Sequence, residues 1–205
     1  MLGEINIVWF KRDLRITDHV PIYKASKESI PFIPLYVLDQ NYWSQNFSSI
    51  RHWNFVYDCL EELNIELSNI GQPLIIKKGS ASNIFKDIQS NFKINKVYAH
   101  EETSNDWVRN ENLSVKNWFA ENLIEFIECP TNGVVRGLKS RDEWIKIKNQ
   151  RLLSELIPSP VKVKKIDNYN SDLISRKSIY FEDDLIFNIQ KGGRKTGLKI
   201  LDTFL

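Results

Sequence analysis

Apolar and polar positions alternate in blocks along the first 130 residues. Short runs of β-branched, leucine and aromatic residues are separated by longer segments in which apolar residues recur every three or four positions. Short apolar runs bounded by polar or turn residues are typical of strands buried in a parallel sheet. From this pattern we expect strands at residues 5–10, 32–38, 73–78, 96–99 and 124–128.

Three segments between these strands have helical period, and each has one apolar stripe that can pack on a sheet. The stripes consist of Trp53, Val56, Leu60, Leu63 and Leu67; of Ile84, Phe85, Ile88 and Phe92; and of Trp107, Val108, Val115, Trp118 and Phe119. The alternation predicts an α/β fold, a doubly wound (Rossmann-like) five-stranded parallel sheet with helices on both faces, over residues 1–130. Trp9, Trp107 and Trp118 are all expected in its core.

The alternation stops after Pro130. Residues 131–190 are rich in Lys, Asn and Ser and are interrupted by Pro158 and Pro160, so they are predicted to form an interdomain linker with a helical piece around residues 140–156. Residues 191–205 contain a glycine pair and then the start of an amphipathic helix. Its apolar face would need a further domain or a partner to cover it.

Composition places the chain among globular proteins, with 42% hydrophobic and 26% charged residues. No apolar run approaches the roughly 20 residues that cross a bilayer, and the N-terminus lacks the pattern of a secretory signal. We therefore expect a cytoplasmic protein with no membrane partner. Cys59 and Cys129 form no CxxC pair and are predicted to be reduced packing residues.

The net charge of +2 does not by itself indicate a nucleic-acid binder. Residues 136–165 hold nine basic and three acidic residues, and we favour a solvated face over a DNA contact for this segment. No GxSxG element, His–Cys pair or Walker loop is visible in the sequence. Catalytic residues are therefore not expected, and DNA is expected to be only an indirect partner.

Residues 8–19, Val-Trp-Phe-Lys-Arg-Asp-Leu-Arg-Ile-Thr-Asp-His, resemble the opening strand and loop of the DNA photolyase/cryptochrome family. Residues 34–39, 49–63 and 192–205 agree with the family in order and spacing, and residues 100–107 and 131–144 resemble a bacterial branch of photolyase-like flavoproteins. The chain departs from the family at His19, where Asn is frequent, and at Gly137, where Arg is common.

The resemblance implies the N-terminal domain of a flavoprotein that uses light for pyrimidine-dimer DNA repair or for blue-light sensing. Such a domain often holds an antenna chromophore: a folate or pterin, a deazaflavin or a flavin. The family's FAD and DNA lesion belong to a helical domain that this chain has no room for, so we expect a helical FAD-binding domain or chain as partner. Deoxyribodipyrimidine photo-lyase activity is not expected of this chain alone.

Ligands of open parallel sheets bind outside the carboxyl ends of the strands, so the loops after the first, second and fourth strands are the expected site. Aromatic, basic and carboxylate side chains there can stack on a heteroaromatic ring and hydrogen-bond to it. The candidate antenna-binding residues are Phe10, Lys11, Arg12, Asp13, Asp39, Arg51, His100, Glu101 and Glu102.

Structural roles compete with binding at these positions. Lys11, Arg12, Asp13 and Arg15 can instead pair with one another and brace the first loop, which is the slightly favoured interpretation. His100 can be a neutral hydrogen-bonded residue. A metal site is not expected, because no second histidine lies near His100 in sequence.

Two other functions remain open from sequence. A stand-alone nucleotide-binding α/β module is disfavoured by the lack of a glycine-rich phosphate loop after the first or fourth strand, and the isolated glycine pair near the C-terminus does not supply one. An inactive remnant that keeps the fold without photochemistry is the other alternative.

Overall fold

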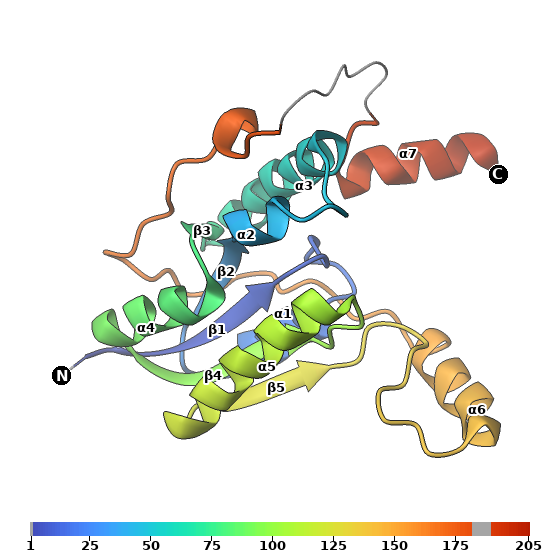
Figure 1. Cartoon of the computed structure of the whole chain (residues 1–205), viewed down its shortest axis with the longest axis horizontal. Helices are drawn as coiled ribbons and strands as arrows, with labels where there is room; N and C mark the ends of the chain where they lie inside the picture. The colour runs from blue at the N-terminus through green and yellow to red at the C-terminus, as the bar shows by residue number, and fades with distance from the viewer. Residues whose placement is uncertain (1, 182–189) are drawn as a thin grey trace.

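The computed structural model describes residues 2–181 and 190–205, and it contains a five-stranded, all-parallel sheet (Figure 1). The strand order is β3-β2-β1-β4-β5. The strands are β1 (Glu4–Phe10), β2 (Phe32–Leu38), β3 (Ile75–Lys78), β4 (Lys93–His100) and β5 (Glu125–Cys129). The predicted parallel α/β sheet is confirmed. β4 begins earlier than its apolar run, because Lys93 already pairs with Glu4 of β1.

Helices cover both faces of the sheet, as predicted. Short α1 (Val20–Ser26) and long α3 (Ile50–Asn69) pack on one face, where Ile22 and Trp53 are fully buried. Helices α4 (Ala81–Asn91) and α5 (Asp106–Glu121) pack on the other face, where the rings of Phe85 and Phe119 meet edge to face with centroids 4.7 Å apart. Burial on both faces explains the nearly continuous apolar runs of the central strands β1 and β2.

Two short helices were not predicted. α1 has only seven residues, and α2 (Gln40–Trp43) only four, so neither shows a helical period in the sequence. Both begin at capping side chains, because His19 and Asp39 accept backbone N–H bonds from Ile22 and Asn41. α2 follows β2 directly and so lies at the carboxyl edge of the sheet, while α1 follows the loop that leaves β1 at the same edge.

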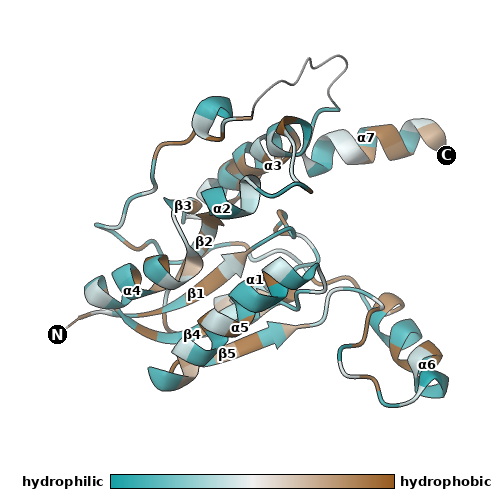
Figure 2. Cartoon of the chain, viewed as in Figure 1, coloured by the Kyte–Doolittle hydropathy of each residue, from teal (hydrophilic) through white to brown (hydrophobic). Residues whose placement is uncertain are grey.

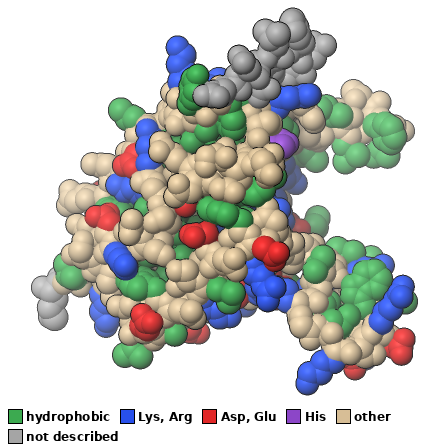
Figure 3. Space-filling model, in the orientation of Figure 1, with side chains coloured by type: hydrophobic (Ala, Val, Ile, Leu, Met, Phe, Trp, Pro, Cys, Tyr) green, Lys and Arg blue, Asp and Glu red, His purple; other side chains and the backbone are tan. Residues whose placement is uncertain are grey.

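The chain beyond β5 has two different parts. Helix α6 (Arg141–Leu152) stands away from the sheet and has no buried residue (Figure 1). Figure 3 shows Lys and Arg side chains around this helix together with exposed hydrophobic side chains. Its helical segment was predicted, although α6 ends before residue 156.

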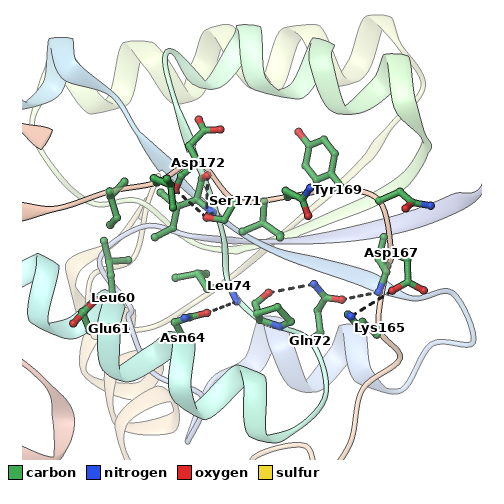
Figure 4. Close-up of a pocket in the computed structure, with 18 residues that line it drawn as sticks. Leu60, Glu61, Asn64, Gln72, Leu74, Lys165, Asp167, Tyr169, Ser171 and Asp172 are labelled. Carbon is green, nitrogen blue, oxygen red and sulfur yellow. Dashed lines mark hydrogen bonds and ion pairs between the residues drawn. The ribbon is translucent and has the colours of Figure 1, made fainter.

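Residues 163–176, here called the edge strap, run along α3 and the outer edge of β3. The backbone N–H of Val163 donates to the carbonyl of Ile70, and the backbone N–H of Asp172 donates to the carbonyl of Ile76, both at 2.8 Å. Figure 4 shows the side chains around this strap. The hydroxyl of Ser171 accepts the backbone N–H of Ile76, and the side-chain oxygen of Gln72 accepts the backbone N–H of Ile166. The strap thus covers an edge strand whose backbone groups would otherwise be free for pairing. Residues 182–189 of the predicted linker lie outside the described residues.

Helix α7 (Arg194–Phe204) projects from the body of the molecule at the C-terminal end (Figure 1). Its apolar residues form a stripe, seen as brown segments in Figure 2. Leu198, Ile200, Leu201 and Phe204 are all exposed, so the expected uncovered apolar face is present. No helix of the described residues is long and apolar enough to cross a membrane. Cys59 and Cys129 are both free thiols, as expected.

Candidate functional site

A cleft of about 550 Å³ opens at the carboxyl edge of the sheet and is here called the carboxyl-edge cleft. The strand order changes direction between β1 and β4, and the loops after these strands, together with α2, α3 and the start of α5, enclose the cleft. This is the switch point at which doubly wound sheets bind ligands, and the volume is that of a small-molecule site. The lining includes Trp9, Lys11, Arg12, Arg15, Asp39, Tyr42, His52, Cys59, Glu102, Trp107, Glu111, Asn112 and Arg194.

Aromatic rings form one side of the cleft. Tyr42 of α2 and Trp107 in the first turn of α5 meet edge to face, with ring centroids 5.7 Å apart. The prediction that Trp107 lies in the core was wrong, because the ring is only half-buried and lines the cleft. Tyr42 was missed by sequence reasoning, since a four-residue helix has no recognisable period. Together the two rings offer a flat ligand a surface for stacking.

Lys11 lies inside the cleft. Its ammonium donates to Oδ1 of Asn112 at 2.9 Å and lies 4.3 Å from the centroid of the Trp9 ring. Burial lowers the pKa of Lys11 to about 8, although the charges of Glu102 and Glu128 oppose the shift. A lysine of lowered pKa in a cleft is a recognised mark of a functional site.

Carboxylates form a second part of the lining. Asp39 caps α2 by accepting the N–H of Asn41 at 2.8 Å, and burial raises its pKa. Burial likewise raises the pKa of Glu111, and the negative charge of Asp39 adds to that shift. Both groups line the cleft and can accept hydrogen bonds from ring N–H groups of a ligand.

Arg12 and Glu102 form an ion pair at the cleft mouth. The Arg12 side chain is 59% exposed, while that of Glu102 is only 6% exposed. The guanidinium is therefore available to an anionic group of a ligand at the entrance, while the carboxylate holds it in place.

Asp13 lies beside the cleft and binds two histidines. Its Oδ2 accepts from Nε2 of His19 at 2.8 Å and from Nδ1 of His100 at 2.6 Å. Burial acts to raise the pKa of Asp13, but the hydrogen bonds from His100 and His19 outweigh it and hold that pKa well below its usual range. Burial lowers the pKa of His19. The three side chains tie the first loop to the end of β4.

We expected no metal site because no other histidine lies near His100 in sequence. The fold nevertheless brings His19 next to His100. Nδ1 of His19 accepts the N–H of Ile22, so the ring proton is on Nε2, the atom that faces Asp13. A metal ligand must present an unprotonated nitrogen. The hydrogen-bond pattern therefore makes this triad a structural brace.

The suggested mutual pairing of the basic loop residues with Asp13 is not what the structure shows. Arg12 pairs with Glu102, and the guanidinium of Arg15 donates to the carbonyls of Thr17 and Asp18. The side chain of Asp13 accepts from the backbone N–H of Lys11 and from the two histidines. The loop is braced, but by the histidines.

The nine candidate residues fall into two groups. Five line the cleft: Phe10, Lys11, Arg12, Asp39 and Glu102. Of these, Phe10 is fully buried and packs on the ring of His19 at 4.7 Å, so it belongs mainly to the core. The other four candidates are not among the described residues that line the cleft: Asp13, Arg51, His100 and Glu101.

Two of these four have visible positions elsewhere. Glu101 pairs with Arg136 and Arg151, both at 3.4 Å, and so ties the segment after β5 to the end of β4. Arg51 is exposed at the start of α3. Neither residue is among those that line the cleft.

The fold and cleft define a class: a doubly wound α/β domain with a ligand site at the switch point. The family model for DNA photolyase matches residues 6–140, and the chain therefore belongs to the DNA photolyase family. It is 29% identical over 119 residues to the tomato (Solanum lycopersicum) cryptochrome DASH, chloroplastic/mitochondrial, covering 55% of this chain and 21% of the relative. It is 26% identical over 143 residues to cryptochrome DASH of Synechocystis, covering 67% of this chain and 26% of that protein.

Solved structures show the same fold. The Synechocystis cryptochrome superposes on all of this chain and on 46% of its own, with a TM-score of 0.76 and 16% identity. An archaeal photolyase from Sulfolobus tokodaii, described with two FAD molecules, superposes on 96% of this chain and 46% of its own, with a TM-score of 0.70 and 21% identity. The chain thus spans less than half the length of these relatives.

Proposed function

We propose that this chain binds a light-harvesting chromophore in the carboxyl-edge cleft and acts with a helical FAD-binding domain in light-driven DNA repair or blue-light sensing. The observation that supports this most is the combination of stacking rings, carboxylates and cations in one cleft at the switch point of a photolyase-family domain. The solved relative described with a second FAD, and with a light-harvesting role for it, supports a chromophore besides the repair flavin.

The lining favours a particular chemistry in the chromophore. Tyr42 and Trp107 suit a flat ring, and Asp39 and Glu111 accept hydrogen bonds, so they suit ring N–H or amino groups. Arg12 at the mouth suits a carboxylate or phosphate. A reduced folate matches all three features, with its pterin ring, the amino group on that ring and its glutamate tail. A flavin nucleotide or a deazaflavin also matches them, through its flat ring, its ring N3–H and its anionic tail.

The partner is proposed to follow residue 190. In this division residues 1–130 are the chromophore domain, residues 131–190 the linker and residues 191–205 the first part of the FAD-binding domain. The uncovered apolar face of α7 supports it, and so does the greater length of the relatives. DNA would then meet the partner domain and touch this chain only indirectly.

Titration of the purified chain with a reduced folate, FMN and FAD, followed by absorbance and fluorescence, tests the proposal. Loss of a stacking ring costs about 1–3 kcal/mol, so Trp107→Ala should weaken binding by about 5- to 150-fold. Trp144→Ala on α6, an exposed tryptophan outside the cleft, is the matched control and should leave the affinity unchanged. Equal effects of the two variants, or no binding of any of the three compounds, would contradict the proposal and leave the inactive remnant as the better account.

A further inference from the structure

The side chain of Lys11 has an unusual environment for a lysine. Its ammonium bonds to a neutral amide, that of Asn112, and faces the ring of Trp9. Among the described residues, no carboxylate oxygen lies within 4.0 Å of its Nζ. By contrast, Lys93, Lys96 and Lys116 each have such a partner. An amine that is removed from water without a close counter-ion loses its proton easily.

Ionisable groups surround Lys11 on several elements, and their effects oppose one another. Asp13 in the first loop, Glu102 after β4 and Glu128 of β5 favour the charged amine, while Arg136 disfavours it. Burial outweighs all of them and lowers the pKa to about 8. At pH 7 roughly a tenth of such an amine is neutral, which is about 200-fold more than for an ordinary lysine.

The neutral amine is also in a place where a reactant can be held. Lys11, Tyr42 and Trp107 line the same cleft, so a flat molecule can stack while its reactive group meets Nζ. Arg12, more than half exposed at the mouth, can pair with an anionic substituent of that molecule. Proximity of this kind favours condensation over reaction at freely exposed lysines.

We propose that Lys11 is a covalent modification site that condenses with aromatic aldehydes carrying an anionic group. The Nζ lone pair attacks the carbonyl carbon, a C–N bond forms, and the carbonyl π electrons move to the oxygen. The resulting carbinolamine loses that oxygen together with the two amine hydrogens as water, which leaves a C=N imine. No oxidant, reductant or further reactant takes part, and lysine imines of this kind are established nucleophilic chemistry in proteins.

Pyridoxal 5′-phosphate is a suitable probe because it has an aromatic ring, an aldehyde and a phosphate. The full chain is incubated with it, the imine is fixed with borohydride, and each modified lysine is quantified by peptide mass spectrometry. Lys11 should be labelled at least about tenfold faster than Lys116, an ion-paired lysine with a 59% exposed side chain. The Lys11 rate should rise with pH to a midpoint near 8.

Two variants complete the test. Lys11→Arg should remove the fast label, while Lys116→Arg should leave it intact. Labelling spread evenly over the exposed lysines, or a Lys11 midpoint as alkaline as that of Lys116, would overturn the inference. Both of these readouts come from the unaltered chain, so they decide the matter even if a variant fails to fold. The test needs no chromophore, and its failure is therefore distinct from failure of the proposed function.

Discussion

Asp13 is the residue on which the loop after β1 depends. It is buried, and one of its carboxylate oxygens accepts from both His19 and His100. The sequence places Asp13 and His100 at the carboxyl edge of the sheet, but it cannot show that the two side chains form a hydrogen bond. The partner that decides their role, His19, is brought in by α1, a helix too short to be predicted.

Asp13→Ala should therefore destabilise the chain strongly. The substitution leaves two buried ring N–H groups without an acceptor, and each such group costs about 1–3 kcal/mol. We expect the free energy of unfolding in urea to fall by about 3 kcal/mol. Asp167→Ala removes a carboxylate that is 73% exposed and that pairs, among the described residues, with Lys165 alone; this change should cost less than about 1 kcal/mol. Similar losses in both variants would show that Asp13 does not brace the loop.

The same triad predicts loss of stability in acid. Burial lowers the pKa of His19 below its ordinary value of 6.5, so below that pH the unfolded chain binds a proton that the folded chain does not. The depressed pKa of Asp13 acts in the same direction at lower pH. The free energy of unfolding should thus decrease as pH falls below about 6.5. Replacement of the exposed His52 by Gln should keep this slope, and a flat profile from neutral pH to about pH 5 would contradict the account.

Among the elements, the strands were the most predictable. All five have apolar runs because both faces of the sheet are covered, and such runs are visible without knowledge of the partners. The edge strap was expected to be a plain connector. Its order comes from hydrogen bonds made by Ser171, Asp172 and Gln72 to distant backbone groups, and polar residues of this kind look the same in a solvated linker.

Gly71 tests how tightly the strap is held. Its φ is +118°, and a Cβ there would lie 2.7 Å from the carbonyl oxygen of Val163. Gly71→Ala should therefore cost about 1–3 kcal/mol and make the strap more sensitive to limited proteolysis. Gly197→Ala is the control: its Cβ meets nothing within 4 Å, and it should leave the strap protected and stabilise α7 by up to about 1 kcal/mol. Equal protease sensitivity in the two variants would mean that the strap is not anchored at Gly71.

Two surfaces of the whole molecule are suited to binding: the carboxyl-edge cleft and the exposed apolar face of α7. The carboxyl-edge cleft is lined by residues of β1, β2, α2, α3, α4, α5 and the start of α7, and by residues of the loops after β1, β2 and β4. The apolar face of α7 is uncovered in the structure. The alternation of apolar runs predicted the fold, and the rule for open parallel sheets predicted the edge that holds the cleft. The rings of Tyr42 and Trp107 became site residues only through three-dimensional packing.

A chromophore that binds in the cleft should be visible in the absorption spectrum of the purified chain. The purified chain is mixed with a reduced folate, FMN or FAD, freed of unbound ligand by gel filtration, and scanned from the near ultraviolet to the blue. The account predicts that at least one compound co-elutes with an altered band, and that Asp39→Ala reduces the bound amount while Asp167→Ala does not. A spectrum confined to the aromatic band of the protein with every compound would contradict it.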